Sequence, residues 1–440
     1  MSSPVQAAID APTSDAPATY RRPWTVPPAP AGPHGHFDGS AVLEELPEPI
    51  AIPVWQFVRD FRLWTETPPE QRRDLFAVRA IANRRRLLTR LGGECPPAML
   101  SALTGLSSVM SDNNQEEERA ASHLLAIAEW ASDTGYLRTA FYVATEAALA
   151  RPTDPILSYT AAMMARRVAD YRRSEAWFRR SLALARKAGD PKAYGRALLG
   201  FANLHMQRFD VDAARAMLLR TVKVARRYSL WALRPLAYHD LFLLTTTEGS
   251  LADAVRYASA ALRGYGRFHP VLPNLAHDFA WMLLCAGYPE PVLPLLKELA
   301  KMQRPAVWKL IVLANVGRAA GALGQTSDFL AAWNEIWCIL DARESDERAA
   351  EALISLARGA EALGDEARAQ LAAQEALRIG LPREEFQEVE AAEDLLAALR
   401  EHRRPIPQIR GATDEEIAST VALVQELLSA ILELPVYTPA

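Results

Sequence analysis

The sequence predicts an all-α fold, a right-handed α-solenoid of about seven helix-turn-helix repeats with further helices at both ends. Three stretches, 169–182, 249–262 and 364–377, share one pattern in which a turn opens a helix whose small or aromatic residues recur at helical spacing. The small residue of each first helix aligns at seven positions: Ala128, Ala162, Ala202, Phe242, Ala280, Gly317 and Ala357. The differences are 34, 40, 40, 38, 37 and 40 residues, and such a period is the mark of a solenoid.

Composition agrees with a soluble folded protein. Half of the 440 residues are hydrophobic and 23% are charged, and a chain of this length suits two domains or one extended array. The net charge of -4, from 49 basic and 53 acidic residues, selects no class of partner. Three distant cysteines predict buried thiols rather than a disulfide framework or a metal site. Because neither a signal peptide nor a membrane-spanning run is apparent, we expect a cytoplasmic protein.

Two regions precede the repeats. Residues 1–49 are rich in Pro and Ala and predict a disordered tail, with a proline-based docking peptide as the alternative. Residues 50–114 predict an N-terminal helical region. One of its helices has Trp55, Val58 and Phe61 on one face, and the next contains Arg84, Arg85 and Arg86. We interpret this arginine run as a solvated helix face, with a nucleic-acid or acidic-partner contact as the alternative.

The repeat region spans residues 115–381. First helices contain a bulky residue beside a small one, as in Leu199-Gly200 and Val316-Gly317, and the turns include Ala169-Asp170-Tyr171 and Gly364-Asp365. Two antiparallel helices approach closely only where a small side chain faces a bulky one. In these features the chain resembles the tetratricopeptide repeat family, in its longer-repeat bacterial form. The resemblance implies a regulator or scaffold rather than an enzyme, although Phe242 and the prolines 289, 291 and 294 depart from the pattern.

Two segments follow the repeats. Residues 382–404 predict a capping helix and the start of a linker, and 405–440 predict a linker, an amphipathic helix and a tail. Thr413 and Glu416 have the spacing of a capping box that opens this last helix. Its apolar face consists of Ile417, Val421, Val424, Leu428 and Ile431. That face must be covered by the solenoid or by another chain, so the helix is a cap, an autoinhibitory lid or a self-association element.

The resemblance also implies that the first helices line a concave, partner-binding surface. The residues that the alignment places there are Tyr159, Met163, Arg166, Arg167, Arg196, Asn203, Gln207, His239, His277, Trp281, Arg318 and Arg358. Aromatic anchors and fork-shaped arginine donors suit a peptide. Some of these residues, Trp281 and Met163 above all, are equally suited to packing between repeats.

No catalytic, cofactor-binding or metal-binding motif is apparent, so we expect no enzymatic activity. The dipeptides His239-Asp240 and His277-Asp278 lie 38 residues apart, which is one repeat. Their recurrence is therefore explained by the repeat, and a metal site would need further ligands.

Charge is distributed unevenly along the chain. Residues 166–234 hold 17 basic and 5 acidic residues, whereas 344–433 hold 9 basic and 20 acidic ones. Such a field can attract an acidic partner to the middle repeats. It can equally fold the acidic C-terminal segment back as a pseudo-ligand or promote head-to-tail contacts between chains. The leading hypothesis is a protein- or peptide-binding scaffold or adaptor. The alternatives are a ligand-responsive regulator that acts on the N-terminal helices and, with less support, a nucleic-acid-binding protein.

Overall fold

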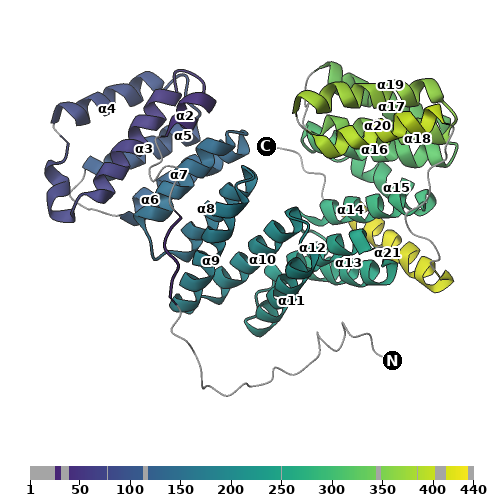
Figure 1. Cartoon of the computed structure of the whole chain (residues 1–440), viewed down its shortest axis with the longest axis horizontal. Coiled ribbons are helices and arrows are strands. Elements are labelled where there is room, and N and C mark those ends of the chain that lie inside the picture. The colour runs from purple at the N-terminus through teal and green to yellow at the C-terminus, as the bar shows by residue number, and fades with distance from the viewer. Residues whose placement is uncertain are drawn as a thin grey trace. The chain divides into compact units, whose positions relative to one another are not determined.

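The computed structural model describes residues 25–30, 39–76, 78–111, 117–248, 250–342, 348–383, 385–401 and 413–434. Most of the predicted tail, most of the linker before the last helix and the final six residues lie outside these ranges. The chain divides into two compact units, residues 1–233 and 234–440, which are described separately below. Figure 1 labels the helices of both units.

All regular structure in the described residues is helical, as predicted. The first unit contains α2 (Ser40–Glu45), α3 (Ala51–Glu66), the 3-10 helix η1 (Pro69–Asp74), α4 (Val78–Leu91), α5 (Pro97–Ser111), α6 (Glu117–Asp133), α7 (Leu137–Ala150), α8 (Pro155–Arg167), α9 (Tyr171–Ala188), α10 (Pro191–Gln207) and α11 (Val211–Arg227). The second contains nearly all of α12 (Leu233–Glu248), then α13 (Leu251–Tyr265), α14 (Leu272–Cys285), α15 (Pro289–Ala300), α16 (Ala306–Ala322), α17 (Thr326–Asp341), α18 (Ala349–Ala362), α19 (Glu366–Gly380), the 3-10 helix η2 (Leu381–Arg383), α20 (Phe386–Arg400) and α21 (Asp414–Leu432).

The predicted repeats correspond to seven consecutive helix pairs, from α6 and α7 to α18 and α19. Within each unit the helices pack mainly on their neighbours in the chain, which is the arrangement of an α-solenoid. Each alignment position lies seven residues before the turn that joins the two helices of its pair. At six of these turns the residue has a positive φ angle: Gly135, Ala169, Phe209, Gly287, Gly324 and Gly364. The seventh, residue 249, lies outside the described residues.

The residue after this turn position caps the second helix in several pairs. The side chains of Asp170, Asp210 and Asp365 each accept a hydrogen bond from the backbone N–H three residues later. Such a cap satisfies one of the unpaired N–H groups at a helix start. The predicted Ala-Asp and Gly-Asp turns are therefore a left-handed residue followed by an N-cap.

The N-terminal region packs on the first repeat pair. Helix α3 buries Val58, Phe61 and Trp64, and it contacts α5 and α7. The short helix α2, within the stretch predicted to be a tail, buries Val42 and contacts α3 and α7. The folded part of the first unit therefore includes residues that composition alone assigns to the tail.

The fold buries one arginine of the run in α4 and leaves the other two exposed. The Arg84 side chain is buried, its Nε donates to Asp60 Oδ2 at 3.0 Å, and its guanidinium lies 3.8 Å from the Phe76 ring centroid. Arg85 and Arg86 are exposed. Arg84 therefore anchors α4 to α3, which leaves two residues of the run on the surface.

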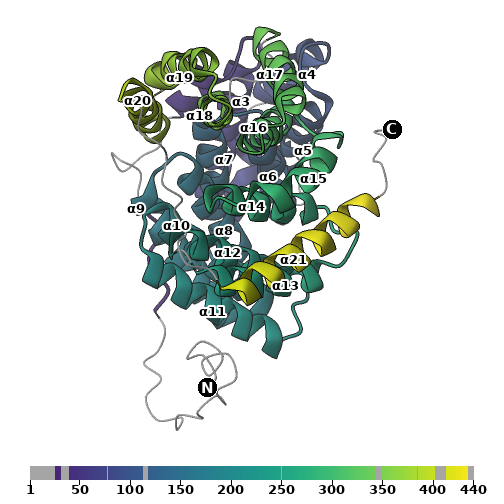
Figure 2. The same cartoon turned by 90° about the vertical axis from the view of Figure 1, so that its right-hand side faces the viewer.

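The last two helices occupy different places in the second unit. Helix α20 continues the array by packing on α19 and α18, as predicted for a capping helix. Helix α21 instead returns to α13, α14 and α15, and Figure 2 shows it running across α13 and α14. The predicted capping box is present, with Glu416 N–H bonded to Thr413 Oγ1 and Thr413 N–H bonded to the Glu416 carboxylate. Of the predicted apolar face, Val424 and Ile431 are buried, whereas Ile417, Val421 and Leu428 are half-buried. The face is thus covered only in part within one chain, and self-association through α21 stays a prediction.

Two further expectations concern the membrane and the cysteines. None of the helices in the described part of the chain combines the length and the apolarity that crossing a bilayer requires. Cys95 is buried as expected, but Cys285 is half-buried and Cys338 is exposed. Cys338 differs because it lies on the solvent side of α17, whose opposite side faces α16.

The left-handed turn at Ala169 yields a stability prediction. Ala169 has φ 58°, a conformation that costs an L-residue about 1 kcal/mol and glycine little. We expect Ala169→Gly to raise the local stability of α8 and α9 by up to about 1 kcal/mol, measured as slower amide hydrogen exchange. The control is Ala216→Gly at an exposed position inside α11, which should lower stability by about 1 kcal/mol. Equal losses in both variants would contradict the assignment.

Candidate functional site

A continuous line of polar side chains crosses the first helices of the second unit and begins at Tyr265, the last residue of the second helix α13. His239 of α12 lies between Tyr265 and Asp278: its Nδ1 is 3.3 Å from Tyr265 Oη, and its Nε2 is 3.0 Å from Asp278 Oδ2. The other oxygen of Asp278 is 3.2 Å from Nδ1 of His277, also on α14. His239 and His277 are both buried, whereas the Asp278 side chain is 30% exposed. One carboxylate therefore holds two imidazoles at the surface of the array.

The line continues into α16 and α18. His277 Nε2 is 3.0 Å from Asn315 Nδ2, and Ser355 Oγ is 3.3 Å from Asn315 Oδ1. Asp278 and Asn315 therefore occupy both ring nitrogens of His277. We call the line Tyr265, His239, Asp278, His277, Asn315 and Ser355 the polar ladder. It links helices from four successive pairs through side chains rather than through apolar contact alone.

The Asp278 carboxylate is the charged centre of the ladder. Burial by itself raises the pKa of this carboxyl, but the hydrogen bonds and charges of His239 and His277 outweigh burial and lower the pKa to about 2. At neutral pH the ladder therefore contains a fixed negative charge. Burial, with the charges of Asp240 and Asp278, raises the pKa of Tyr265, which keeps its phenol protonated.

Glycines bring α16 and α18 into backbone contact beside the ladder. A Cβ atom on Gly321 would lie 2.1 Å from the Gly359 carbonyl oxygen, and one on Gly359 would lie 2.6 Å from the Gly317 carbonyl oxygen. No side chain fits at such distances, so the crossing of these two helices requires glycine. Asn315 and Ser355 meet because of this crossing.

The same crossing pairs two arginines, one helical turn beyond the ladder. Arg318 of α16 and Arg358 of α18 are both half-buried. Burial lowers the pKa of Arg358, and the positive charge of Arg318 lowers it further. Arg318 Nη1 donates to Cys285 Sγ at 3.6 Å. Within the described ranges, neither guanidinium forms an ion pair with a carboxylate, although Glu361 is near enough for its charge to favour the charged form of Arg358.

The predicted residues of the second unit thus fall into two groups. His239 and His277 are internal members of the polar ladder, since their ring nitrogens already bond Tyr265, Asp278 and Asn315. Arg318 and Arg358 are the half-buried cationic part, and the half-buried Trp281 belongs to the same row of first-helix positions. We call Trp281, Arg318 and Arg358 the arginine site.

The predicted residues of the first unit form a second, basic surface. Tyr159 stacks edge-on against Phe178, with 6.1 Å between ring centroids. Burial raises the pKa of its phenol, and the nearby charges of Arg196 and Arg166 oppose that rise. The structure therefore brings one aromatic and two arginines together across α8 and α10.

The other predicted residues of the first unit differ in exposure. Met163 and Asn203 are half-buried, whereas Gln207 is exposed. Arg167 donates to the hydroxyl of the buried Ser132, so part of its hydrogen-bonding capacity joins α8 to α6.

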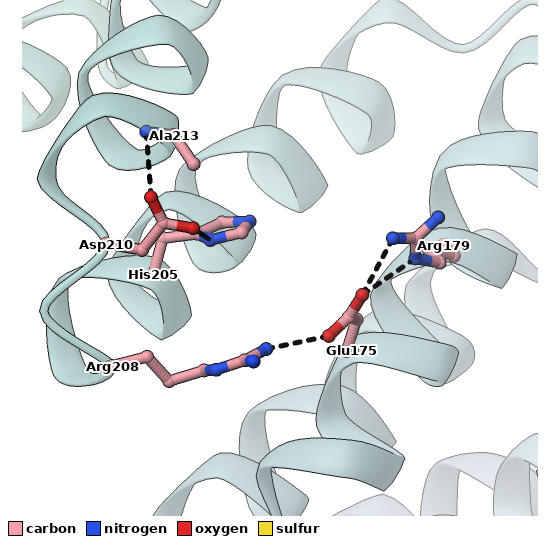
Figure 3. Close-up of polar contacts among 6 residues, drawn as sticks. All are labelled: Glu175, Arg179, His205, Arg208, Asp210 and Ala213. Atoms are coloured by element: carbon pink, nitrogen blue, oxygen red, sulfur yellow. Dashed lines mark hydrogen bonds and ion pairs between the residues drawn. The ribbon is translucent and has the colours of Figure 1, made fainter.

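Acidic residues between 166 and 234 are largely occupied within the fold. Three of the five, Asp170, Asp190 and Asp210, cap helices α9, α10 and α11. Figure 3 shows Asp210 also bonded to His205, and Glu175 held by Arg179 and Arg208. Glu175 receives these arginine hydrogen bonds at 2.7 to 3.1 Å. The basic excess of this segment is thus left largely unneutralised by its own acids.

Sequence reasoning did not select Asn315, Ser355 or Gly359. The signal that could have found them is positional: Asp278, Asn315 and Ser355 are 37 and 40 residues apart and stand two residues before the aligned small residue of their helices. Gly317 and Gly321, four residues apart, share one face of α16. A helix face made of glycine and polar residues indicates close crossing with a polar neighbour.

Comparisons with known proteins give structural likeness only. No protein-family model matches the sequence, and no curated protein matches it significantly. The chain is similar to BtubC from P. vanneervenii (14% identity, 74% of this chain and 96% of the other, TM-score 0.36). It is also similar to the Rap conjugation gene regulator of plasmid pLS20 in complex with the Phr* peptide (11%, 86% and 97%, 0.43). A Rap protein complexed with competence and sporulation factor matches at 10% (81% and 98%, 0.34). At such scores the ligands of those proteins say nothing about this chain.

The glycine crossing gives a prediction for stability. Gly321→Ala places a methyl group against the Gly359 backbone, and such overpacking typically costs about 1–3 kcal/mol. We expect α16 and α18 to lose hydrogen-exchange protection by at least about 2 kcal/mol, because backbone cannot move aside as a side chain can. Gly93→Ala is the control, since a Cβ there meets no atom within 4 Å. Equal effects of the two substitutions would disprove the close crossing.

The lowered pKa of Asp278 gives a prediction for pH. The ionised form is favoured in the folded state, so its stabilisation is present above the unfolded pKa near 4 and is lost as the pH falls toward 2. The shift corresponds to about 2 kcal/mol, of which about half is lost by pH 3. We expect urea denaturation at pH 6 and pH 3 to show a smaller pH effect for Asp278→Asn than for the natural chain. Asp394→Asn at an exposed position of α20 is the control, and an unchanged pH effect in Asp278→Asn would contradict the ladder.

Proposed function

We propose that this chain is a non-enzymatic binding protein that holds an acidic peptide or protein segment on its first helices. The observation that carries this proposal is the arginine site. Two half-buried guanidiniums from successive repeats stand side by side with no ion-paired carboxylate in the described part of the chain. Keeping two cations together at a partly buried place is unfavourable unless an anion completes the site. A carboxylate of a partner supplies that anion and can accept paired hydrogen bonds from a guanidinium.

The hydrogen bonds of the polar ladder fix the helices that carry the arginine site. Its members satisfy one another through hydrogen bonds from α12 to α18, so the first helices are held in register behind the arginines. A pre-organised site loses less conformational entropy when a ligand binds. Trp281, at the equivalent position of the preceding first helix, offers an apolar contact. Aromatic and arginine residues are frequent anchors at interfaces.

The basic surface of the first unit favours the same class of ligand. Arg166 and Arg196 flank Tyr159, and most acids of that segment are engaged as caps or ion pairs. Long-range attraction to an acidic partner follows from this excess charge.

Nucleic-acid binding is less well supported than peptide binding. Arg84 is paired with Asp60 and buried, so the arginine run of α4 offers fewer free cations than its sequence indicates. The effect of a ligand on the N-terminal helices, which a regulator requires, stays a prediction.

The arginine site can be tested with paired peptides. An array of synthetic dodecapeptides compares each Asp- or Glu-containing sequence with its Asn or Gln isostere, and the acidic members should bind more tightly. Hydrogen bonds to charged groups contribute about 1.5–3 kcal/mol each, so Arg318→Gln with Arg358→Gln should weaken binding by at least about tenfold in fluorescence anisotropy.

The control for this experiment is Arg263→Gln, which removes an exposed arginine from α13, a second helix of the same unit. Binding should be nearly unchanged in that variant. If no acidic peptide binds the natural chain, or if the double variant folds normally and binds equally well, the proposed function is wrong.

A further inference from the structure

Second helices form a further surface on which another helix can pack. Helix α21 already occupies one part of it. This helix rests on α13, α14 and α15, with Leu423, Val424, Leu427 and Ile431 buried against them. Directly after the helix, Glu433 forms an ion pair with Arg267. The surface formed by two second helices and the first helix between them therefore binds an amphipathic helix mainly through apolar contact.

The next surface along the chain is also formed by two second helices and the first helix between them, and it is open to solvent. It lies between α15 and α17, over α16, and forms a cleft of about 750 Å³ that we call the second-helix cleft. Its apolar lining comprises Leu293, Pro294, Leu313, Val316, Leu323, Ala332, Leu428 and Leu432. The last two belong to α21, which borders the cleft, and Leu432 is 62% exposed there. The cleft thus continues the apolar surface that α21 covers in part.

Proline helps to shape one wall of this cleft. Pro294 lies inside α15, is exposed and faces the cleft. Proline removes a backbone N–H and crowds the preceding turn of a helix. Pro294, one of the prolines that depart from the repeat pattern, therefore forms part of this surface and does not break the helix.

The charges around the second-helix cleft are mostly negative. Helices α17 and α21 contain acidic residues and no Lys, Arg or His. On the rim, Lys297 is paired with Asp328 at 2.5 Å and Lys301 with Glu298 at 2.6 Å, and Glu290 is the acid of the lining that has no ion pair among the described residues. Lys309 pairs with Glu335 from outside the lining. An acidic helix such as α21 from another copy would be repelled, and a basic one attracted.

We propose that the second-helix cleft binds an amphipathic helix of a partner protein, with an apolar face and Lys or Arg residues on its flanks. Helix-in-groove recognition uses apolar anchors at positions i, i+3 or i+4 and i+7, and the neighbouring surface already holds a helix by such anchors. This site is separate from the arginine site. It lies mainly on second helices and prefers a basic ligand, whereas the arginine site lies on first helices and prefers an acidic one.

Two synthetic peptides test the proposal on the full chain. Both have leucines at i, i+3, i+4 and i+7 on an alanine-rich helix, with lysine flanks in one and glutamate flanks in the other. We expect the lysine peptide to bind at least tenfold more tightly in fluorescence anisotropy, and the difference to shrink as salt is raised.

Matched substitutions locate the binding. Ala331→Trp fills the cleft from an exposed position on α17, whereas Asn334→Trp adds the same side chain to that helix outside the cleft lining. Only Ala331→Trp should weaken the lysine peptide by tenfold or more. The arginine-site variant should leave this binding unchanged, so failure here and failure of the proposed function are distinguishable.

Several results would overturn the proposal. Absence of binding by either peptide up to millimolar concentration, equal binding of both, or indifference to Ala331→Trp each contradict it. Self-association of the natural chain that Ala331→Trp abolishes, without peptide binding, would assign the cleft to a second copy. Binding of an apolar dye that Ala331→Trp abolishes, again without peptide binding, would assign it to a small molecule.

Discussion

The close crossing of α16 and α18 is the constraint on which the arrangement of the second unit depends. Gly317, Gly321 and Gly359 allow the two backbones to touch, and the side chains on either side of that contact are then fixed relative to each other. Asn315 reaches Ser355 on one side, and Arg318 stands beside Arg358 a turn further along. A single methyl group in the contact would separate both pairs. The chemistry of the first helices thus follows from the absence of side chains at three positions.

The two proposed sites differ because the two kinds of helix differ. First helices bear the polar ladder and two cations, since their glycine and small residues bring polar side chains from successive repeats within bonding distance. Second helices bear apolar and acidic residues around a cleft, and α21 covers only part of that surface. One side therefore suits an anion and the other an amphipathic helix.

Three of the acidic residues in the basic segment of the first unit act as helix N-caps. Because Asp170, Asp190 and Asp210 are used as N-caps, their carboxylates lie at helix starts, where they satisfy backbone N–H groups. Asp170 also forms an ion pair with Arg173, but the 17 basic residues of the segment outnumber its 5 acidic ones. The acidic residues of this segment are thus concentrated at the turns, and the rest of the same helices is basic.

The sequence by itself determined the all-helical fold, the seven pairs and the turns between them. Local sequence signals are sufficient to predict these features. A left-handed turn residue, an N-cap and apolar positions at helical spacing all occur within one repeat of about 40 residues. The capping box of α21 was equally readable from Thr413 and Glu416.

Only the tertiary structure decided which residues are functional candidates. His239 and His277 looked like surface ligands, but Asp278 and Asn315, one repeat away, occupy their ring nitrogens. Arg84 looked like part of a basic patch, but Asp60, 24 residues away, pairs with it. The place where α21 rests, and the open cleft beside it, likewise depend on contacts across more than 100 residues of chain. Periodicity specifies neighbours within a repeat, whereas these contacts depend on how whole helices pack.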